Sequence, residues 1–352
     1  MHGDGVTPVP PPESEYASAS TELAVGPDDR VYMAYKSADE SGVYEITSEG
    51  FELLGDRRFP WAHGLALAAV PTAPSSVVLA VGVPHGTQMR PTFHRWDGSS
   101  WEDLGRRLTV SPGVPLELIA EEDSFLFATY TPTTRDESST VPLLRRDGDG
   151  WETLATVSRD GGAAVVLSRM VSDGMGRPVI ETRYNGRDGA TVDVLRWSGT
   201  DWEPLLSAAP FEGRPGLVPS VSGDVARVIL HDGRLEVEIY EAGAWTRVGA
   251  PSPSPGRIPL AAIDRNGVPH VAWSSATDGG DSRFHLACWN GSRWLELGEP
   301  RNAHPADAGL GGATDSRDMS LAFTADGSVW LAWSEEREPA TPERVHLWRY
   351  TR

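Results

Sequence analysis

The chain has very little cysteine and lysine, and it has no long apolar run. Cys288 is the only cysteine in 352 residues, which excludes an intrachain disulfide and a zinc site built on several cysteines. Lys36 is the only lysine, a bias that indicates a GC-rich genome rather than a chemistry. No stretch approaches the roughly 18 apolar residues that a membrane-spanning helix needs. We therefore expect no membrane span.

The start of the chain carries no secretory signal as written. Residues 1–5 lack both the charged start and the apolar run that such a signal needs. Localisation stays open, because a removed leader would mean a secreted or periplasmic protein and its absence a cytoplasmic one.

Positive charge is also scarce. Lys and Arg total 31 against 50 Asp and Glu, a formal charge of −19, so nucleic acid and anionic membranes would be repelled. Apolar residues make up 39% of the chain and include 13 Trp, which is ample for a buried core. The 37 Gly and 28 Pro exclude a mainly helical bundle.

Several familiar catalytic motifs are missing. The nine histidines are scattered and form no His-Glu-x-x-His pair, and no Gly-x-Ser-x-Gly elbow occurs. Gly309–Gly312 is not followed by Lys-Ser/Thr, so it is not a phosphate-binding loop. We expect no metal and no cofactor.

An internal repeat dominates what is present. A hairpin motif recurs with its second aromatic residue at positions 51, 101, 151, 202, 245 and 294, so successive copies are 43 to 51 residues apart. The three clearest copies are Arg95–Gly105, Arg196–Leu205 and Cys288–Gly298, and Val345–Arg349 begins a seventh. Such a period changes the fold prediction entirely, because it indicates a repeat architecture.

Each repeat predicts four short antiparallel strands. Asp97-Gly98 and Asn290-Gly291 are two-residue hairpin turns between alternating strands. A second hairpin precedes each motif, as in Leu321–Trp333 and Leu260–Trp273. Seven such units predict an all-β, seven-bladed β-propeller with four-stranded antiparallel blades.

The last unit has only three strands before the chain ends at Arg352. We expect residues 1–17, which are rich in proline, to supply the missing outer strand and close the ring, since an outer strand needs only one paired edge. The alternative is a disordered N-terminus and a three-stranded last blade. Residues 18–352 are expected to form a single propeller domain.

The Trp-x-Gly-x-x-Trp-x-x-Leu-Gly hairpin, preceded by an Ala-Trp-Ser strand, resembles the bacterial repetitive seven-bladed β-propeller proteins. That group includes sugar-binding lectins. The resemblance implies a fold more firmly than an activity, because the residues that carry it are structural.

Candidate site residues lie where the chain enters the innermost strands, since these loops gather on one face of a propeller. His63, Arg257 and Asp318 stand at or just before such strands, and Trp61 beside His63 offers an apolar face to a sugar ring or packs between blades. The long segment Glu299–Ser320 adds His304, Asp307 and Arg317, and it is either a functional insertion or a solvated loop. Polar residues at strand starts also occur simply because they face channel water.

Two functions remain open. A recognition module would bind a glycan or protein ligand at the channel mouth through Trp61, His63, Arg257, His304, Asp307 and Asp318. An enzyme, such as a hydrolase, lyase or isomerase, would use His63, His304 and Asp318 for proton transfer and Arg257 or Arg317 as a clamp. We favour recognition, because catalytic motifs are missing. Acidic loops such as Asp39-Glu40 and Glu335-Glu336 could bind Ca²⁺, although no EF-hand spacing exists.

Overall fold

The computed structural model describes most of the repeats but not the whole chain. The described residues are 20–36, 40–60, 64–73, 75–86, 88–105, 116–120, 125–129, 140–147, 150–158, 165–173, 175–186, 189–211, 216–218, 225–231, 234–251, 257–276, 282–298, 319–335 and 344–351.

The described residues form antiparallel β-sheets and a single 3₁₀ turn, η1 (Leu54–Asp56). The first two sheets contain β1 (Ser20–Val25), β2 (Val31–Lys36), β3 (Glu40–Thr47), β4 (Gly50–Leu53) and β5 (Phe59–Pro60), then β6 (Leu65–Ala69), β7 (Val77–His85), β8 (Gln88–Trp96) and β9 (Trp101–Asp103). The third and fourth contain β10 (Leu116–Ala120), β11 (Phe125–Thr129), β12 (Val141–Asp147) and β13 (Gly150–Val157), then β14 (Val165–Ser172), β15 (Pro178–Gly186), β16 (Gly189–Trp197) and β17 (Trp202–Pro210).

The remaining three sheets complete the series of seven in the described part of the chain. They contain β18 (Gly216–Val218), β19 (Val225–His231), β20 (Arg234–Glu241) and β21 (Ala244–Arg247), then β22 (Arg257–Ile263), β23 (Pro269–Ala276), β24 (Ser282–Trp289) and β25 (Trp294–Glu296), then β26 (Met319–Phe323), β27 (Val329–Glu335) and β28 (Arg344–Tyr350). Each sheet pairs its strands in chain order, as the repeat predicts. Five sheets have four strands, β5 adds a fifth strand to the first sheet, and the last sheet has three.

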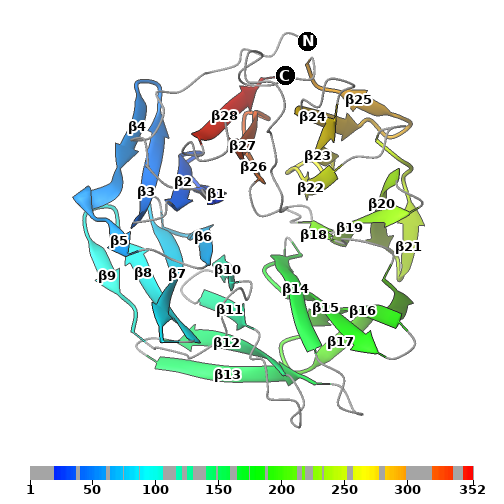
Figure 1. Cartoon of the computed structure of the whole chain (residues 1–352), viewed down its shortest axis with the longest axis horizontal. Coiled ribbons are helices and arrows are strands. Elements are labelled where there is room, and N and C mark those ends of the chain that lie inside the picture. The colour runs from blue at the N-terminus through cyan, green and yellow to red at the C-terminus, as the bar shows by residue number, and fades with distance from the viewer. Residues whose placement is uncertain are drawn as a thin grey trace.

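The sheets follow one another around a common centre, with the first strand of each nearest that centre (Figure 1). The all-β architecture of four-stranded antiparallel sheets predicted from the sequence is confirmed. Residues 1–17, expected to add an outer strand to the last sheet, lie outside the described residues. No helix in the described part of the chain is long and apolar enough to cross a membrane.

Apolar side chains pack between neighbouring sheets rather than within one central core. Separate buried clusters join the first sheet to the second, the second to the third, the third to the fourth and the fourth to the fifth. A larger cluster spans the fifth, sixth and seventh sheets. One further cluster joins the first sheet to the last, with Met33 and Tyr35 beside Trp330 and Leu347. Every sheet is therefore stabilised from both of its faces.

The hairpin turns explain the first half of the repeat motif. Gly98, Gly199 and Gly291 have φ of 98°, 102° and 92°, which favours glycine. The residue before each glycine caps the turn with its side chain. Asp97 Oδ1 accepts the N–H groups of residues 99 and 100, both at 2.8 Å, and these bonds lower the Asp97 pKa to about 2.

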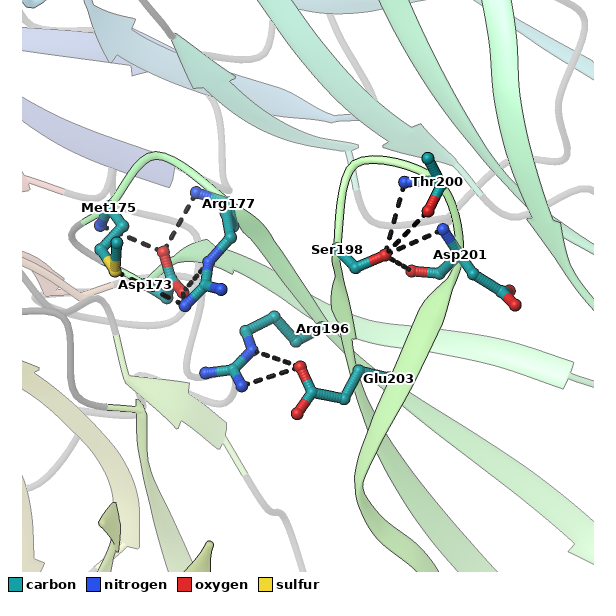
Figure 2. A network of polar contacts seen from close by, with 8 residues as sticks. All are labelled: Asp173, Met175, Arg177, Arg196, Ser198, Thr200, Asp201 and Glu203. Atoms are coloured by element: carbon teal, nitrogen blue, oxygen red, sulfur yellow. Dashed lines mark hydrogen bonds and ion pairs between the residues drawn. The ribbon is translucent and has the colours of Figure 1, made fainter. Parts of the chain in front are cut away.

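Ser198 performs the same task in the fourth sheet, where its Oγ accepts the N–H of Asp201 at 3.0 Å (Figure 2). On the preceding hairpin of that sheet, the buried Asp173 accepts the N–H groups of Met175 and Arg177 and pairs with the Arg177 side chain (Figure 2). Asp, Asn and Ser are thus interchangeable in the motif, because each places an oxygen acceptor over the turn.

The second aromatic residue of the motif links consecutive sheets. Trp101 Nε1 donates to the carbonyl of Leu54 at 2.8 Å, Trp151 Nε1 to that of Leu104 at 3.2 Å, and Trp245 Nε1 to that of Leu205 at 2.9 Å. Each acceptor belongs to the sheet before. The indole N–H groups of Trp202 and Trp294 find no acceptor among the described residues. In these three cases the second Trp of one repeat therefore contacts the Leu of the repeat before it.

Replacing Trp101 with Phe should lower the free energy of unfolding by about 1 kcal/mol more than replacing Trp202 with Phe. Both variants lose similar ring area, but only the first loses an indole hydrogen bond. Urea unfolding followed by far-UV circular dichroism measures the difference. Equal losses in the two variants would contradict a stabilising role for this bond.

Replacing Gly55 with Ala should destabilise the protein more than replacing Gly105 with Ala. Both glycines have positive φ, 66° and 72°, so both variants carry a backbone cost of about 1 kcal/mol. A Cβ at Gly55 would lie 2.6 Å from the Trp96 ring, whereas one at Gly105 meets nothing within 4 Å. We expect a further loss of about 1–3 kcal/mol in the Gly55 variant, measured by the same unfolding experiment. Identical unfolding curves would show that the Trp96 ring moves aside freely.

Candidate functional site

A cavity of about 340 Å³ lies where the innermost strands meet. Six of the seven innermost strands contribute to its wall: β1, β6, β10, β14, β22 and β26. Ligand sites in proteins are typically concave, mostly apolar and furnished with a few polar groups. This cavity is concave and carries a few charged and hydroxyl side chains, although polar atoms make up slightly more than half of its exposed surface, and it is the candidate site.

The wall is apolar apart from a few side chains. Alanine, leucine, isoleucine, valine and methionine supply most of it. The charged residues are Glu22 on β1, Glu117 on β10 and Arg169 on β14, and Ser172 and Ser320 add hydroxyl groups. Two acidic residues and one arginine from three different sheets thus line one cavity.

Local backbone irregularity positions Arg169. The pairing between β14 and β15 shifts register between Leu167 and Arg169, which is a β-bulge. Bulges redirect side chains and are common beside binding sites. Arg169 Nε is buried and has no hydrogen-bond partner among the described residues, so the guanidinium is only partly satisfied by the protein.

A buried carboxyl group stands behind Arg169. Glu181 on β15 pairs directly with Arg169 across the strands and is fully buried, and neither of its oxygens has a hydrogen-bond partner in the described structure. Burial raises the pKa of Glu181 to about 7, although the positive charges of Arg227 and Arg169 act in the opposite direction. Arg227 is already committed to Glu238, with its Nε 2.8 Å from Oε2. Glu181 is therefore protonated in a large fraction of molecules near neutral pH, and in that fraction it does not neutralise the charge of Arg169.

Most of the site residues predicted from the sequence lie outside the described residues. These are Trp61, His63, His304, Asp307, Arg317 and Asp318. Arg257 is the first residue of β22 and pairs with Ser274 of β23, so its backbone lies where an innermost strand begins, as predicted. Which of these side chains converge stays a prediction.

The sequence analysis missed the charged residues of the cavity itself. Glu22, Glu117 and Arg169 each sit inside a short apolar strand, in Ser20–Val25, Leu116–Ala120 and Val165–Ser172. A single charge within a short innermost strand was the available signal, because most other residues of these strands are apolar and pack between sheets.

No group of three or more His, Cys, Asp or Glu residues is placed to hold a metal ion within the part of the chain that the structure describes. Most of the acidic loop residues considered for Ca²⁺ lie outside that part, among them Asp39 and Glu336.

Comparisons with solved structures show a β-propeller fold. The fucose-specific lectin from Aleuria aurantia matches with a TM-score of 0.51 at 13% identity, over 82% of this chain and 97% of the lectin. YCF48 bound to D1 peptide matches with a TM-score of 0.51 at 14% identity, over 100% of this chain and 98% of the other. A fungal alcohol oxidase of the AA5 family, in complex with copper, matches with a TM-score of 0.57 at 10% identity, over 99% of this chain and 76% of the oxidase.

No protein-family model matches the chain, and no curated protein matches it in sequence. The solved structures therefore support the propeller predicted from the repeat, at the level of the fold alone.

Replacing Glu181 with Gln should stabilise the protein at pH 8 and have little effect at pH 5. The folded pKa of about 7 exceeds the ordinary value of 4.5, so the folded state retains a proton that the unfolded state releases. The free energy of unfolding therefore falls as pH rises from about 4.5 to about 7, by roughly 2–4 kcal/mol, and Gln removes this loss. Urea unfolding at the two pH values measures it.

Glu238→Gln is the matched control, because Glu238 is paired with Arg227 and Arg247. That variant should be destabilised at pH 8. If the Glu181 variant is destabilised to the same extent, Glu181 is ionised and paired in the native protein.

Proposed function

We propose that this protein is a closed, seven-bladed β-propeller that acts as a recognition module for a glycan or protein ligand. The ligand would enter the central cavity and contact its rim. The observation that carries the proposal is that Glu22, Glu117 and Arg169, from three different sheets, line one cavity. Unlike charges in one small cavity orient a polar ligand and exclude others.

The closed ring is supported by contacts between the first and last sheets. Leu23 donates its N–H to Ser320 Oγ at 2.8 Å, and Ala325 donates its N–H to Asp29 Oδ1 at 2.7 Å. The cluster that joins Met33 and Tyr35 to Trp330 adds apolar packing at the same junction. In this proposal residues 1–17 add the outer strand of the last blade, and residues 18–352 are one domain.

The rim of the site would be supplied by the residues that precede or begin the innermost strands. Trp61, His63, Arg257, His304, Asp307 and Asp318 are proposed to contact the ligand there. Their strands all run in the same direction along the cavity, because each begins a sheet of the same topology. Their starts therefore share one end of the cavity.

A single site fits this chain better than a set of repeated sites. The repeated residues, such as the hairpin tryptophans, bind neighbouring sheets together. The charged wall residues differ from sheet to sheet, with Glu22, Glu117 and Arg169 on three of them. The lectin and the peptide-bound protein among the structural neighbours support recognition as the proposed role.

Binding should be detected on a glycan array or a peptide array probed with the full chain, with and without calcium. Arg169→Ala should weaken any binding about tenfold or more, because a hydrogen bond to a charged group is lost. Arg293→Ala is the control, since Arg293 is exposed in the β24–β25 hairpin and far in sequence from the wall residues. That variant should bind like the wild type.

Two outcomes would overturn the proposal or a part of it. Silence of the folded protein on both arrays would overturn recognition of these ligands. Binding that survives Arg169→Ala but is lost in His304→Ala and Asp318→Asn would place the ligand on the rim alone and remove the role of the cavity.

A further inference from the structure

Three polar side chains form a hydrogen-bonded chain across the sixth sheet, away from the cavity. Ser275 lies on β23, His285 on β24 and Glu296 on β25. Ser275 Oγ is 2.7 Å from His285 Nε2, and His285 Nδ1 is 2.7 Å from Glu296 Oε1. A hydroxyl on Nε2 and a carboxylate on Nδ1 is the order found in serine nucleophile triads.

The strand register creates this arrangement. Trp273 pairs with His285, Ser275 with Arg283, and Ala287 with Glu296. Side chains two residues apart on a strand share a face of the sheet. Ser275, His285 and Glu296 therefore lie on a diagonal of one face, at the spacing over which longer side chains reach one another.

The imidazole of His285 is held in place by its surroundings. Trp273 stacks on it with ring centroids 4.8 Å apart and an interplanar angle of 8°. An ionised carboxylate can only accept a hydrogen bond, so in the neutral imidazole the hydrogen lies on Nδ1, which donates to Glu296. The Nε2 lone pair then faces the Ser275 hydroxyl, which is the orientation of a general base.

The group is open to solvent. The side chain of His285 is 15% exposed, that of Glu296 is 46% exposed, and Ser275 is half-buried. A small substrate therefore has access to the hydroxyl without passage through the core.

A comparison with the seventh sheet shows which of these contacts occur twice and which occur in the sixth sheet alone. Trp333 and His346 stack there as Trp273 and His285 do, with centroids 5.3 Å apart. Two residues after its tryptophan, the seventh sheet has Glu335 where the sixth has Ser275. The Trp–His stack is thus shared by the sixth and seventh sheets, whereas the hydroxyl is present in the sixth alone of these two.

We propose that Ser275 is a nucleophile, with His285 as its general base and Glu296 as the positioning residue, and that this site hydrolyses small activated esters. None of the three lines the cavity, so the proposal is independent of ligand recognition.

The reaction would proceed in two steps. His285 Nε2 takes the Ser275 proton as Oγ attacks the ester carbonyl carbon, and the C=O electron pair moves onto the oxygen. Collapse of this intermediate breaks the bond to the alkoxide, which takes the proton from His285 and leaves as the alcohol. Water, deprotonated by His285, then attacks the acyl-serine, and Ser275 recovers its proton as the carboxylic acid departs.

The test uses the full chain with p-nitrophenyl acetate and, separately, a fluorophosphonate probe followed by intact-mass and peptide mass spectrometry. We expect one adduct per chain, on Ser275, and no adduct in Ser275→Ala. Ser292→Ala is the matched control, because that hydroxyl belongs to the same sheet but bonds only within its turn, to Asn290. It should be labelled like the wild type.

Glu296→Gln distinguishes positioning from a merely structural role. It should lower kcat for the ester by about tenfold or more at unchanged KM, with an unchanged unfolding midpoint. A folded wild type that forms no adduct on Ser275, or labelling that persists unchanged in His285→Ala, would overturn the proposal. Array binding by Ser275→Ala would still report on the recognition site, so the two proposals fail separately.

Discussion

Packing between successive sheets is the constraint on which the rest of this structure depends. No sheet has a hydrophobic core of its own, and each buries its two faces against its neighbours. The indole of Trp101 and the carbonyl of Leu54 show one way in which the repeat supports this, because their hydrogen bond joins two successive sheets. With each sheet packed against the next, the innermost strands lie around a common centre, and the cavity is a result of the packing rather than a separate feature.

The residues that line the cavity are of two kinds, those that the packing of the sheets requires and those that can vary from sheet to sheet. Its walls need small apolar residues where strands approach closely, and Ala66, Ala68 and Ala261 meet that need. The few charged positions contribute little to the packing, so they are free to differ from one sheet to the next. Glu181, which lies behind the wall, shows the cost of burying a carboxyl group without hydrogen bonds, because burial raises its pKa to about 7.

The fold was largely predictable from the sequence, whereas the site was not. The aromatic pair and the glycine between Trp96 and Trp101 recur because every blade solves the same packing problem, and a repeated solution is visible in one chain. Arg169 serves a single place and leaves no repeat, so only the three-dimensional neighbourhood identifies it. Ser275, His285 and Glu296 lie on three different strands. The register of those strands brings them together, and the sequence spacing of the three residues does not reveal that register. Their sequence distances resemble those of any scattered polar residues.

The first and last sheets meet without an indole hydrogen bond, because Phe51 replaces the tryptophan of the motif in the first sheet. That junction joins Leu23 to Ser320, residues 297 positions apart. During synthesis the apolar face of the first sheet stays uncovered until the last sheet, its packing partner, has emerged from the ribosome. Contacts of such long sequence separation form late and slowly. The contact between the first and last sheets is thus the last to protect their apolar faces from aggregation.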